Sequence, residues 1–236
     1  MSNDSRTRIR KAFEPVALGL GRLGLTPDAL TLIGFAITVV GAVLVARQLW
    51  LLGGLVIFLG GVFDMFDGTL ARATGKVSNL GAFMDSVFDR AGEAIVYIGL
   101  IAGLQATGWA DVPVVAAAAM GAAFMVSYTR AKSEGLGFSS GSGMAAVGIM
   151  PREVRLVILS LGLIIAGLLG TAVEVSEVSL APAGSAALPP GIVALEIALA
   201  IIAIGATITV IQRILHVRSQ ARHQANQTHQ EQGERT

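Results

Sequence analysis

Cysteine is absent from this sequence of 236 residues, and charged residues are scarce. The absence of cysteine excludes disulfide bonds, catalytic thiolates and cysteine-ligated metal sites. Only 14% of the residues are charged, against roughly 25% in an ordinary soluble domain. The formal net charge is only +1, whereas a nucleic-acid-binding protein is expected to carry a strong basic excess. Hydrophobic residues make up 53% of the chain and its mean hydropathy is +0.70. This composition predicts an integral membrane protein with no nucleic-acid partner.

Apolar stretches of membrane length recur along the chain, and a helix needs about 20 such residues to cross a bilayer. The predicted fold is an all-α integral membrane protein with six transmembrane helices. We place the spans at about 29–46, 50–64 with an extension to 72, 80–105, 112–128 with an extension to 134, 152–171, and 192–214. Glycine and alanine are abundant in them, and small residues let membrane helices approach closely. A tight bundle is therefore expected.

Polar segments flank these spans at both ends of the chain. Residues 1–25 are predicted to form a cytoplasmic basic segment and an amphipathic helix from about Phe13 to Gly24. That helix mixes leucines with Glu14 and Arg22, which suits the membrane interface. Residues 26–217 then form the six-helix domain. Residues 218–236 are polar and are predicted to be a disordered cytoplasmic tail.

Basic residues lie mainly on one side of the predicted membrane topology. They occur in the N-terminal segment, in the connections after the second and fourth spans, and in the tail, whereas Arg47 is the only one on the other side. The positive-inside rule therefore predicts a multi-pass plasma-membrane protein with both termini in the cytoplasm. Trp50 and Trp109 fall at the outer ends of spans and are expected at the lipid interface.

Two pairs of aspartates occur between residues 64 and 89, at the edge of the apolar spans: Asp64 and Asp67, then Asp85 and Asp89. A carboxylate at the end of a membrane-length apolar segment is costly, so its presence indicates function. Spacings of three and four residues place each pair on one helix face. A polar turn at 75–79 separates the pairs. Two consecutive antiparallel helices can therefore direct all four carboxylates into one cleft on the cytoplasmic side.

Four carboxylates in one cleft repel each other unless cations neutralise them. Oxygen ligands without cysteine or histidine favour Mg²⁺, Mn²⁺ or Ca²⁺ over Zn²⁺. Two cations bridged by carboxylates can hold a phosphoryl or pyrophosphoryl group. Gly68 and Gly81 would let such a ligand approach the backbone, and Arg72 could neutralise a phosphate.

The spacing Asp-x2-Asp-Gly-x2-Ala-Arg-x8-Gly-x3-Asp-x3-Asp, from Asp64 to Asp89, resembles the signature of the CDP-alcohol phosphotransferase family. The resemblance implies a six-helix membrane enzyme, expected to be a homodimer, that displaces CMP from a CDP-linked lipid with an alcohol. It also implies two Mg²⁺ ions, with Mn²⁺ as the alternative. By the same resemblance, Asp64, Asp67, Asp85 and Asp89 would be metal ligands, and Asp89 would also be the catalytic general base. The implied CDP-lipid contacts are Thr26, Pro27, Asp28, Ala29, Gly68, Arg72 and Ser78.

A basic cluster is expected beside the aspartates, at the cytoplasmic ends of the last three spans: Lys132, Arg152, Arg155 and Arg213. Such a cluster fits an anionic acceptor such as a sugar or polyol phosphate. These segments resemble the phosphatidylinositol-phosphate synthase branch of the family, in which the acceptor is an inositol phosphate. The same residues would also serve as membrane anchors, because cytoplasmic loops are basic in any case.

The predicted function is the metal-dependent transfer of a phosphatidyl group from CDP-diacylglycerol to inositol phosphate in phospholipid biosynthesis, with release of CMP. Glycerol 3-phosphate is the alternative acceptor. A divalent-cation transporter is the alternative from another class, because intramembrane aspartates also mark ion pathways. The glycine-rich stretch from Gly135 to Gly143 lacks the Lys-Ser/Thr of a phosphate loop, so a flexible loop is expected there.

Overall fold

The structure is a computed structural model that describes residues 3–106, 111–138, 144, 147–171 and 188–233. The described residues form helices and connections, with no strand among them. The helices are α1 (Asn3–Arg22), α2 (Pro27–Ala46), α3 (Trp50–Phe63), α4 (Met65–Ala73), α5 (Asn79–Gln105), α6 (Asp111–Gly135), α7 (Arg152–Leu169) and α9 (Pro190–Gly233). The predicted all-α membrane fold is thus confirmed in its class.

Two helices begin at hydroxyl caps that the sequence makes recognisable. Thr26 precedes Pro27 and its side chain accepts a hydrogen bond of 3.2 Å from the amide of Ala29 at the start of α2. Ser78 likewise accepts one of 3.0 Å from the amide of Gly81 at the start of α5. A capping hydroxyl satisfies an amide that has no partner within its own helix. Both caps fix where helices near the aspartates begin.

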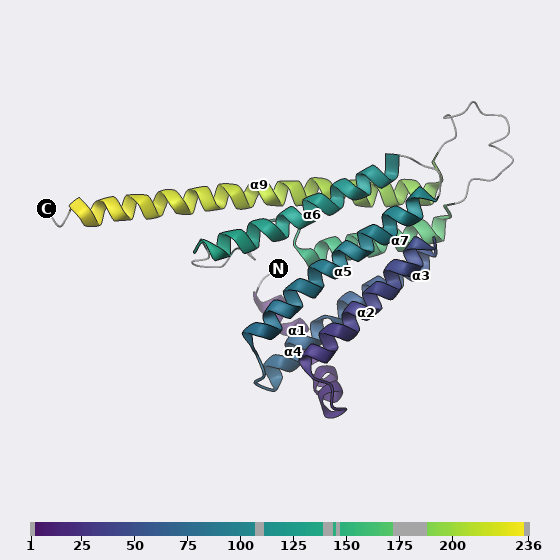
Figure 1. Cartoon of the computed structure of the whole chain (residues 1–236), viewed down its shortest axis with the longest axis horizontal. Helices are drawn as coiled ribbons and strands as arrows, with labels where there is room; N and C mark the ends of the chain where they lie inside the picture. Colours follow the sequence, from purple (N-terminus) through teal and green to yellow (C-terminus); the bar gives the residue numbers. More distant parts are fainter. Residues whose placement is uncertain (1–2, 107–110, 139–143, 145–146, 172–187, 234–236) are drawn as a thin grey trace.

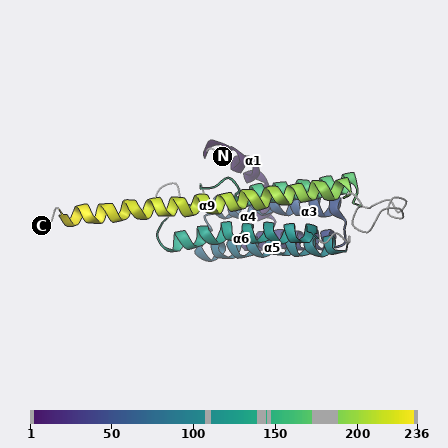
Figure 2. The same cartoon turned by 90° about the horizontal axis from the view of Figure 1, so that it is seen from above.

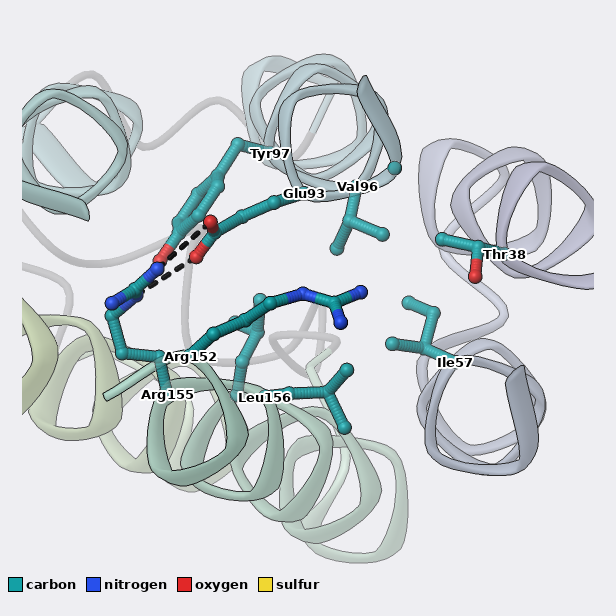
Figure 3. A pocket seen from close by; sticks show the side chains of 10 residues that line it. Thr38, Ile57, Glu93, Val96, Tyr97, Arg152, Arg155 and Leu156 are labelled. Carbon is teal, nitrogen blue, oxygen red and sulfur yellow. Dashed lines mark hydrogen bonds and ion pairs between the residues drawn. The ribbon is translucent and has the colours of Figure 1, made fainter. Parts of the chain in front are cut away.

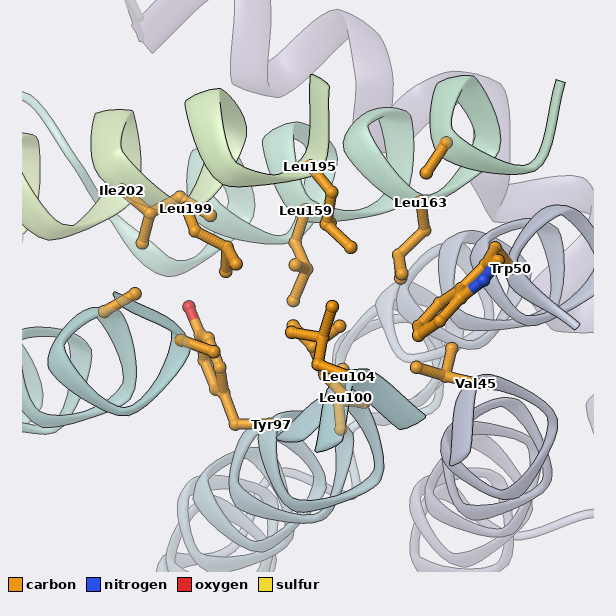
Figure 4. Packing of buried hydrophobic residues seen from close by; sticks show 14 of the residues in the cluster. Val45, Trp50, Tyr97, Leu100, Leu104, Leu159, Leu163, Leu195, Leu199 and Ile202 are labelled. Carbon is orange, nitrogen blue, oxygen red and sulfur yellow. The ribbon is translucent and has the colours of Figure 1, made fainter. Parts of the chain in front are cut away.

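The helices α2, α3, α7, α9, α6 and α5 form a closed ring, and α4 continues α3 as part of the same member. Each member packs against the next in this order, and α5 packs against α2 to close the ring. Figures 1 and 2 show these helices running alongside one another, with α9 continuing well beyond the bundle toward the C-terminus. The core lies inside the ring, where Tyr97, Leu100 and Leu104 of α5 face Leu159 and Leu163 of α7 and residues of α9 (Figure 4).

Trp50 belongs to this core, and the prediction that it lies at the lipid interface is wrong. Only 3% of Trp50 is exposed, and its indole nitrogen donates a hydrogen bond of 3.0 Å to Thr171. Gly103 of α5 makes room for the ring, because a Cβ there would lie 2.8 Å from Cη2 of Trp50. Trp109 lies outside the described residues, as do residues 139–143 of the glycine-rich stretch.

Among the described residues, four helical stretches are long and apolar enough to cross a membrane: 27–46, 50–73, 111–135 and 190–224. The second consists of α3 and α4, which meet at Asp64. The remaining members of the ring, α5 and α7, carry several charged residues toward their N-terminal ends. The protein is therefore a helical membrane protein, and the count of six spans stays a prediction.

The two ends of the chain differ from the sequence prediction. Helix α1 begins at Asn3, well before Phe13, and packs Ala17 against Phe66 and Leu70 of α4. Helix α9 continues to Gly233, well past residue 214, where the last predicted span ends. Extending an existing helix adds one hydrogen bond per ordered residue, and Arg, Gln, Ala and Glu of this segment are good helix formers.

Candidate active site

Three of the four predicted aspartates converge at one end of the ring. Asp64 lies between α3 and α4, Asp67 lies in the first turn of α4, and Asp85 lies on α5. One carboxylate oxygen of each lies within 4.8 Å of the others. Three carboxylates at this separation repel each other, and oxygen atoms are the ligands that hard divalent cations prefer. The donor set thus fits a divalent metal ion of the Mg²⁺ or Mn²⁺ type.

Helix α2 orients two of these carboxylates. The hydroxyl of Thr31 donates a hydrogen bond of 2.6 Å to Oδ2 of Asp67, whose side chain is buried. The other oxygen of Asp67 accepts a hydrogen bond from the amide of Gly68. One turn along α2, a Cβ on Gly34 would lie only 3.4 Å from Oδ1 of Asp64. The hydroxyl at residue 31 and the missing side chain at residue 34 thus shape the metal-binding end of the cleft.

Asp89 lies one turn beyond Asp85 on α5 and has a different environment. Its Oδ1 lies 2.6 Å from Nη1 of Arg152, and the same nitrogen donates a hydrogen bond of 2.8 Å to Oδ2 of Asp64. The contact with Asp89 is an ion pair without hydrogen-bond geometry, so this buried oxygen accepts no hydrogen bond from the described residues. Arg152 therefore brings α7 to the aspartates, and Asp89 keeps an oxygen that could accept a proton.

The predicted CDP-lipid contacts gather where α2 and α5 begin. A Cβ on Gly81 would lie 3.1 Å from the hydroxyl of Ser78 and 3.7 Å from Oδ1 of Asp28. On α4, the guanidinium of Arg72 lies over Gly68, because a Cβ there would lie 3.1 Å from its Nη2. Helix N-termini favour anions through unpaired amides and the helix dipole. The structure thus brings the starts of α2 and α5 close together and places the guanidinium of Arg72 beside Gly68, the residue after Asp67.

Arg152 and Arg155 line one pocket between α2, α3, α5 and α7 (Figure 3). Arg155 is 2% exposed and donates hydrogen bonds of 2.8 and 2.9 Å to the two oxygens of Glu93. It donates a third, of 3.1 Å, to the carbonyl of Met150. In Figure 3 the guanidinium of Arg152 extends between Val96 and Leu156, whereas Arg155 turns toward Glu93.

The other two predicted acceptor residues lie outside this pocket. Arg213 of α9 is 4% exposed and donates a hydrogen bond of 3.0 Å to the carbonyl of Val147 and another to that of Val126. It thereby ties α9 to α6 and to the connection before α7. Lys132 is exposed in the last turn of α6. Of the predicted basic cluster, only Arg152 contacts the aspartates.

Sequence reasoning missed Thr31, Glu93 and Tyr97. Glu93 and Tyr97 lie four and eight residues after Asp89, so helical periodicity could have placed them on the same face of α5. The Tyr97 hydroxyl is buried and makes no hydrogen bond to the described residues. Thr31 lies 36 residues from its partner Asp67, and no local pattern links the two.

A helical membrane protein with clustered carboxylates, converging helix starts and arginines at one end has the features of a metal-dependent transferase acting on a phosphorylated lipid. The profile of the CDP-alcohol phosphatidyltransferase family matches residues 24–221. The chain belongs to this family and is therefore an enzyme, a transferase of phospholipid biosynthesis.

Its relatives include enzymes named for inositol phosphate. An archaetidylinositol phosphate synthase of Pyrococcus horikoshii is 36% identical over 159 residues, which is 67% of this chain and 80% of the relative. A phosphatidylinositol phosphate synthase of Streptomyces avermitilis is 34% identical over 226 residues, 92% of this chain and 82% of the relative.

Solved structures of one such enzyme share the fold. The phosphatidylinositol phosphate synthase of Mycobacterium tuberculosis with bound CDP-DAG gives a TM-score of 0.69 at 28% identity, covering 88% of this chain and 94% of that chain. The same enzyme in complex with manganese and citrate gives a TM-score of 0.67 at 27% identity, covering 86% and 87%. The manganese complex and the aspartate cluster together point to a divalent-metal enzyme.

Proposed function

We propose that this protein transfers a phosphatidyl group from CDP-diacylglycerol to a hydroxyl of inositol phosphate and releases CMP. The observation that carries the proposal is the cluster of Asp64, Asp67 and Asp85, with Asp89 joined to it through Arg152. This arrangement combines carboxylates suited to a metal-bound diphosphate with a separate carboxylate suited to proton transfer.

The substrates are inferred from the relatives. One solved relative holds CDP-DAG, and relatives from both archaea and bacteria are named as inositol phosphate synthases. Those relatives favour inositol phosphate over glycerol 3-phosphate as the acceptor. Family membership favours the transferase over the cation transporter.

Asp64, Asp67 and Asp85 would hold Mg²⁺, or Mn²⁺ as the alternative, with Asp89 as the fourth predicted ligand at a site for two ions. Bound metal would neutralise charge that develops on the diphosphate. The helix starts at Thr26 and Ser78 would face the nucleotide side of the donor, together with Gly68 and Arg72.

Asp89 would act on the acceptor. Its Oδ1 would take the proton of the attacking hydroxyl while the hydroxyl oxygen bonds to the phosphorus on the lipid side. The bond from that phosphorus to the CMP oxygen breaks, and CMP leaves with the electron pair. A positioned base of this kind contributes about 10²–10⁴-fold to the rate.

Arg152 would bind the phosphate of the acceptor, because it already lies against Asp89 and reaches into the pocket of Figure 3. Arg155, held by Glu93, would orient the wall of that pocket. Lys132 and Arg213 would add positive potential at the same end of the bundle. Six transmembrane spans would place the acyl chains in the bilayer and the site at the cytoplasmic face, and a homodimer is expected from the family resemblance.

The test compares wild-type protein with Asp89→Asn in lipid vesicles that contain CDP-diacylglycerol. Wild-type protein should release CMP only when a divalent metal and a phosphorylated polyol are both present. Asp89→Asn should lower turnover by at least about 10²-fold while it still binds the CDP-lipid. CMP release that does not need an acceptor, or full activity of Asp89→Asn, would contradict the proposal.

A further inference from the structure

A second pocket lies between α1, α4 and the start of α2, outside the aspartate cluster. Its empty volume is about 560 Å³, and its lining includes Leu18, Arg22, Leu25, Leu70, Thr74 and Lys76. Helices α1 and α4 pack closely beside it, because a Cβ on Gly21 would lie 2.7 Å from Cδ1 of Leu70. The pocket is therefore a feature of how the N-terminal helix docks on the bundle.

This pocket lies on the other side of α4 from Gly68 and Arg72, the two predicted CDP-lipid contacts on that helix. A helix has 3.6 residues per turn, so side chains two positions apart point in roughly opposite directions. Leu70 lies two positions after Gly68, and Thr74 lies two positions after Arg72. Pro27 is the one predicted CDP-lipid contact that also lines this pocket. The pocket is therefore a ligand site separate from the predicted nucleotide site.

Two cations flank the pocket. Arg22, in the last turn of α1, and Lys76, after α4, are exposed. Neither forms an ion pair within the part of the chain that the structure describes. Together they present two positive charges to one opening, which suits a phosphate group.

Large apolar side chains stand exposed beside each cation. Leu23 follows Arg22 and is 79% exposed, and Val77 follows Lys76 and is 67% exposed. The floor of the pocket is apolar as well, through Leu18, Leu25 and Leu70. Exposed apolar residues alternating with basic ones suit the boundary between headgroups and acyl chains, where basic side chains are attracted to anionic lipid. A soluble phosphate ion has no apolar group that could contact this surface, whereas a phospholipid has acyl chains that can.

We propose that this pocket binds the headgroup phosphate of an anionic membrane phospholipid, with Arg22 and Lys76 on the phosphate and Leu23 and Val77 among the acyl chains. The bound lipid would fix α1 and the end of α4 to the membrane interface. Because α4 also carries Asp67, the site would couple the lipid environment to the position of the metal-binding end of the cleft.

The test measures lipid retention by native mass spectrometry on the full-length protein, titrated with phosphatidylglycerol or phosphatidylcholine and without CDP-lipid. Wild-type protein should retain one phosphatidylglycerol in preference to phosphatidylcholine. Arg22→Gln/Lys76→Gln should weaken that retention by about tenfold or more, since each basic residue near anionic lipid contributes roughly a factor of five. Arg218→Gln/Arg222→Gln is the matched control, because it removes two exposed charges from α9 and should leave retention unchanged.

A second variant separates the lipid from a free anion. Leu23→Ser/Val77→Ser alters only exposed side chains and should also weaken phosphatidylglycerol retention, and millimolar inorganic phosphate should not displace the lipid. Saturating CMP should leave it bound as well. Equal retention by wild type and Arg22→Gln/Lys76→Gln, an equal loss in the control, or displacement by phosphate would overturn the proposal. Displacement by CMP would assign the lipid to the catalytic site and would overturn it too.

Discussion

The aspartate cluster depends on one hydroxyl from a distant helix. Asp67 is buried, with one oxygen on the amide of Gly68 and the other on the hydroxyl of Thr31. A carboxylate that must bind a metal is oriented by such hydrogen bonds, and their loss typically costs 10–100-fold in metal affinity. Thr31 is thus a positioning residue for the site.

Replacing Thr31 tests this role. Thr31→Val keeps the shape of the side chain and removes the donor, so it should weaken Mn²⁺ binding by about 10–100-fold. Thr31→Ser keeps the donor and should restore most of that affinity. Metal titration by calorimetry on purified protein measures both variants. Equal affinities in Thr31→Val and wild type would show that α2 does not orient Asp67.

At the residue scale, the sequence predicted the aspartates because their spacing is local. Three and four residues along one helix decide which side chains share a face. The partners that complete the site come from far along the chain, since Arg152 lies 88 residues from Asp64. The sequence predicted that Arg152 and Arg213 are both basic and cytoplasmic. The spacing of residues along the chain could not show that Arg152 contacts carboxylates whereas Arg213 contacts backbone carbonyl groups.

Helix α5 carries the second aspartate pair, and glycine keeps it close to α2. A Cβ on Gly103 would lie 2.5 Å from the carbonyl oxygen of Val45, and one on Gly99 would overlap the carbonyl oxygen of Ala42. Small residues at such crossings let the backbones pack directly. The two helices whose starts frame the site are therefore positioned by contacts far from it.

Gly103→Ala should lower the thermal stability of the purified protein, because the added methyl group forces α2 and α5 apart. Overpacking of this kind costs about 1–3 kcal/mol. The matched control is Gly121→Ala on α6, where an added Cβ meets nothing within 4 Å, and its melting temperature should not fall. Equal melting temperatures for Gly103→Ala and Gly121→Ala would show that the close approach contributes nothing.

The ends of elements were harder to predict than their interiors. The caps at Thr26 and Ser78 are local features, because each hydroxyl accepts a hydrogen bond from an amide only three residues further along the chain. The last predicted span ends at 214 because the residues after it are polar, although no glycine or proline interrupts the chain before Gly233, where α9 ends. Helices α3 and α4 divide at Asp64, although its backbone stays helical in φ and ψ.

The whole molecule is a ring of helices with its chemistry at one end. The predicted orientation places this end in the cytoplasm, and the absence of cysteine makes the prediction easy to test. Two single-cysteine variants are used. Ser219→Cys places a cysteine on α9 near the predicted cytoplasmic side, and Ser179→Cys places one between the fifth and sixth predicted spans, on the predicted outer side. In intact cells, a membrane-impermeant maleimide should label Ser179→Cys, and Ser219→Cys only after permeabilisation. The reverse pattern would place the active site on the outer face.

A competition experiment tests whether the acceptor is an inositol phosphate. Purified protein in vesicles with CDP-diacylglycerol and Mg²⁺ receives inositol phosphate and glycerol 3-phosphate at equal concentration, and the lipid products are identified by mass. We expect phosphatidylinositol phosphate as the dominant product, formed in proportion to the CMP released. Phosphatidylglycerophosphate as the dominant product, or CMP without either lipid, would contradict it.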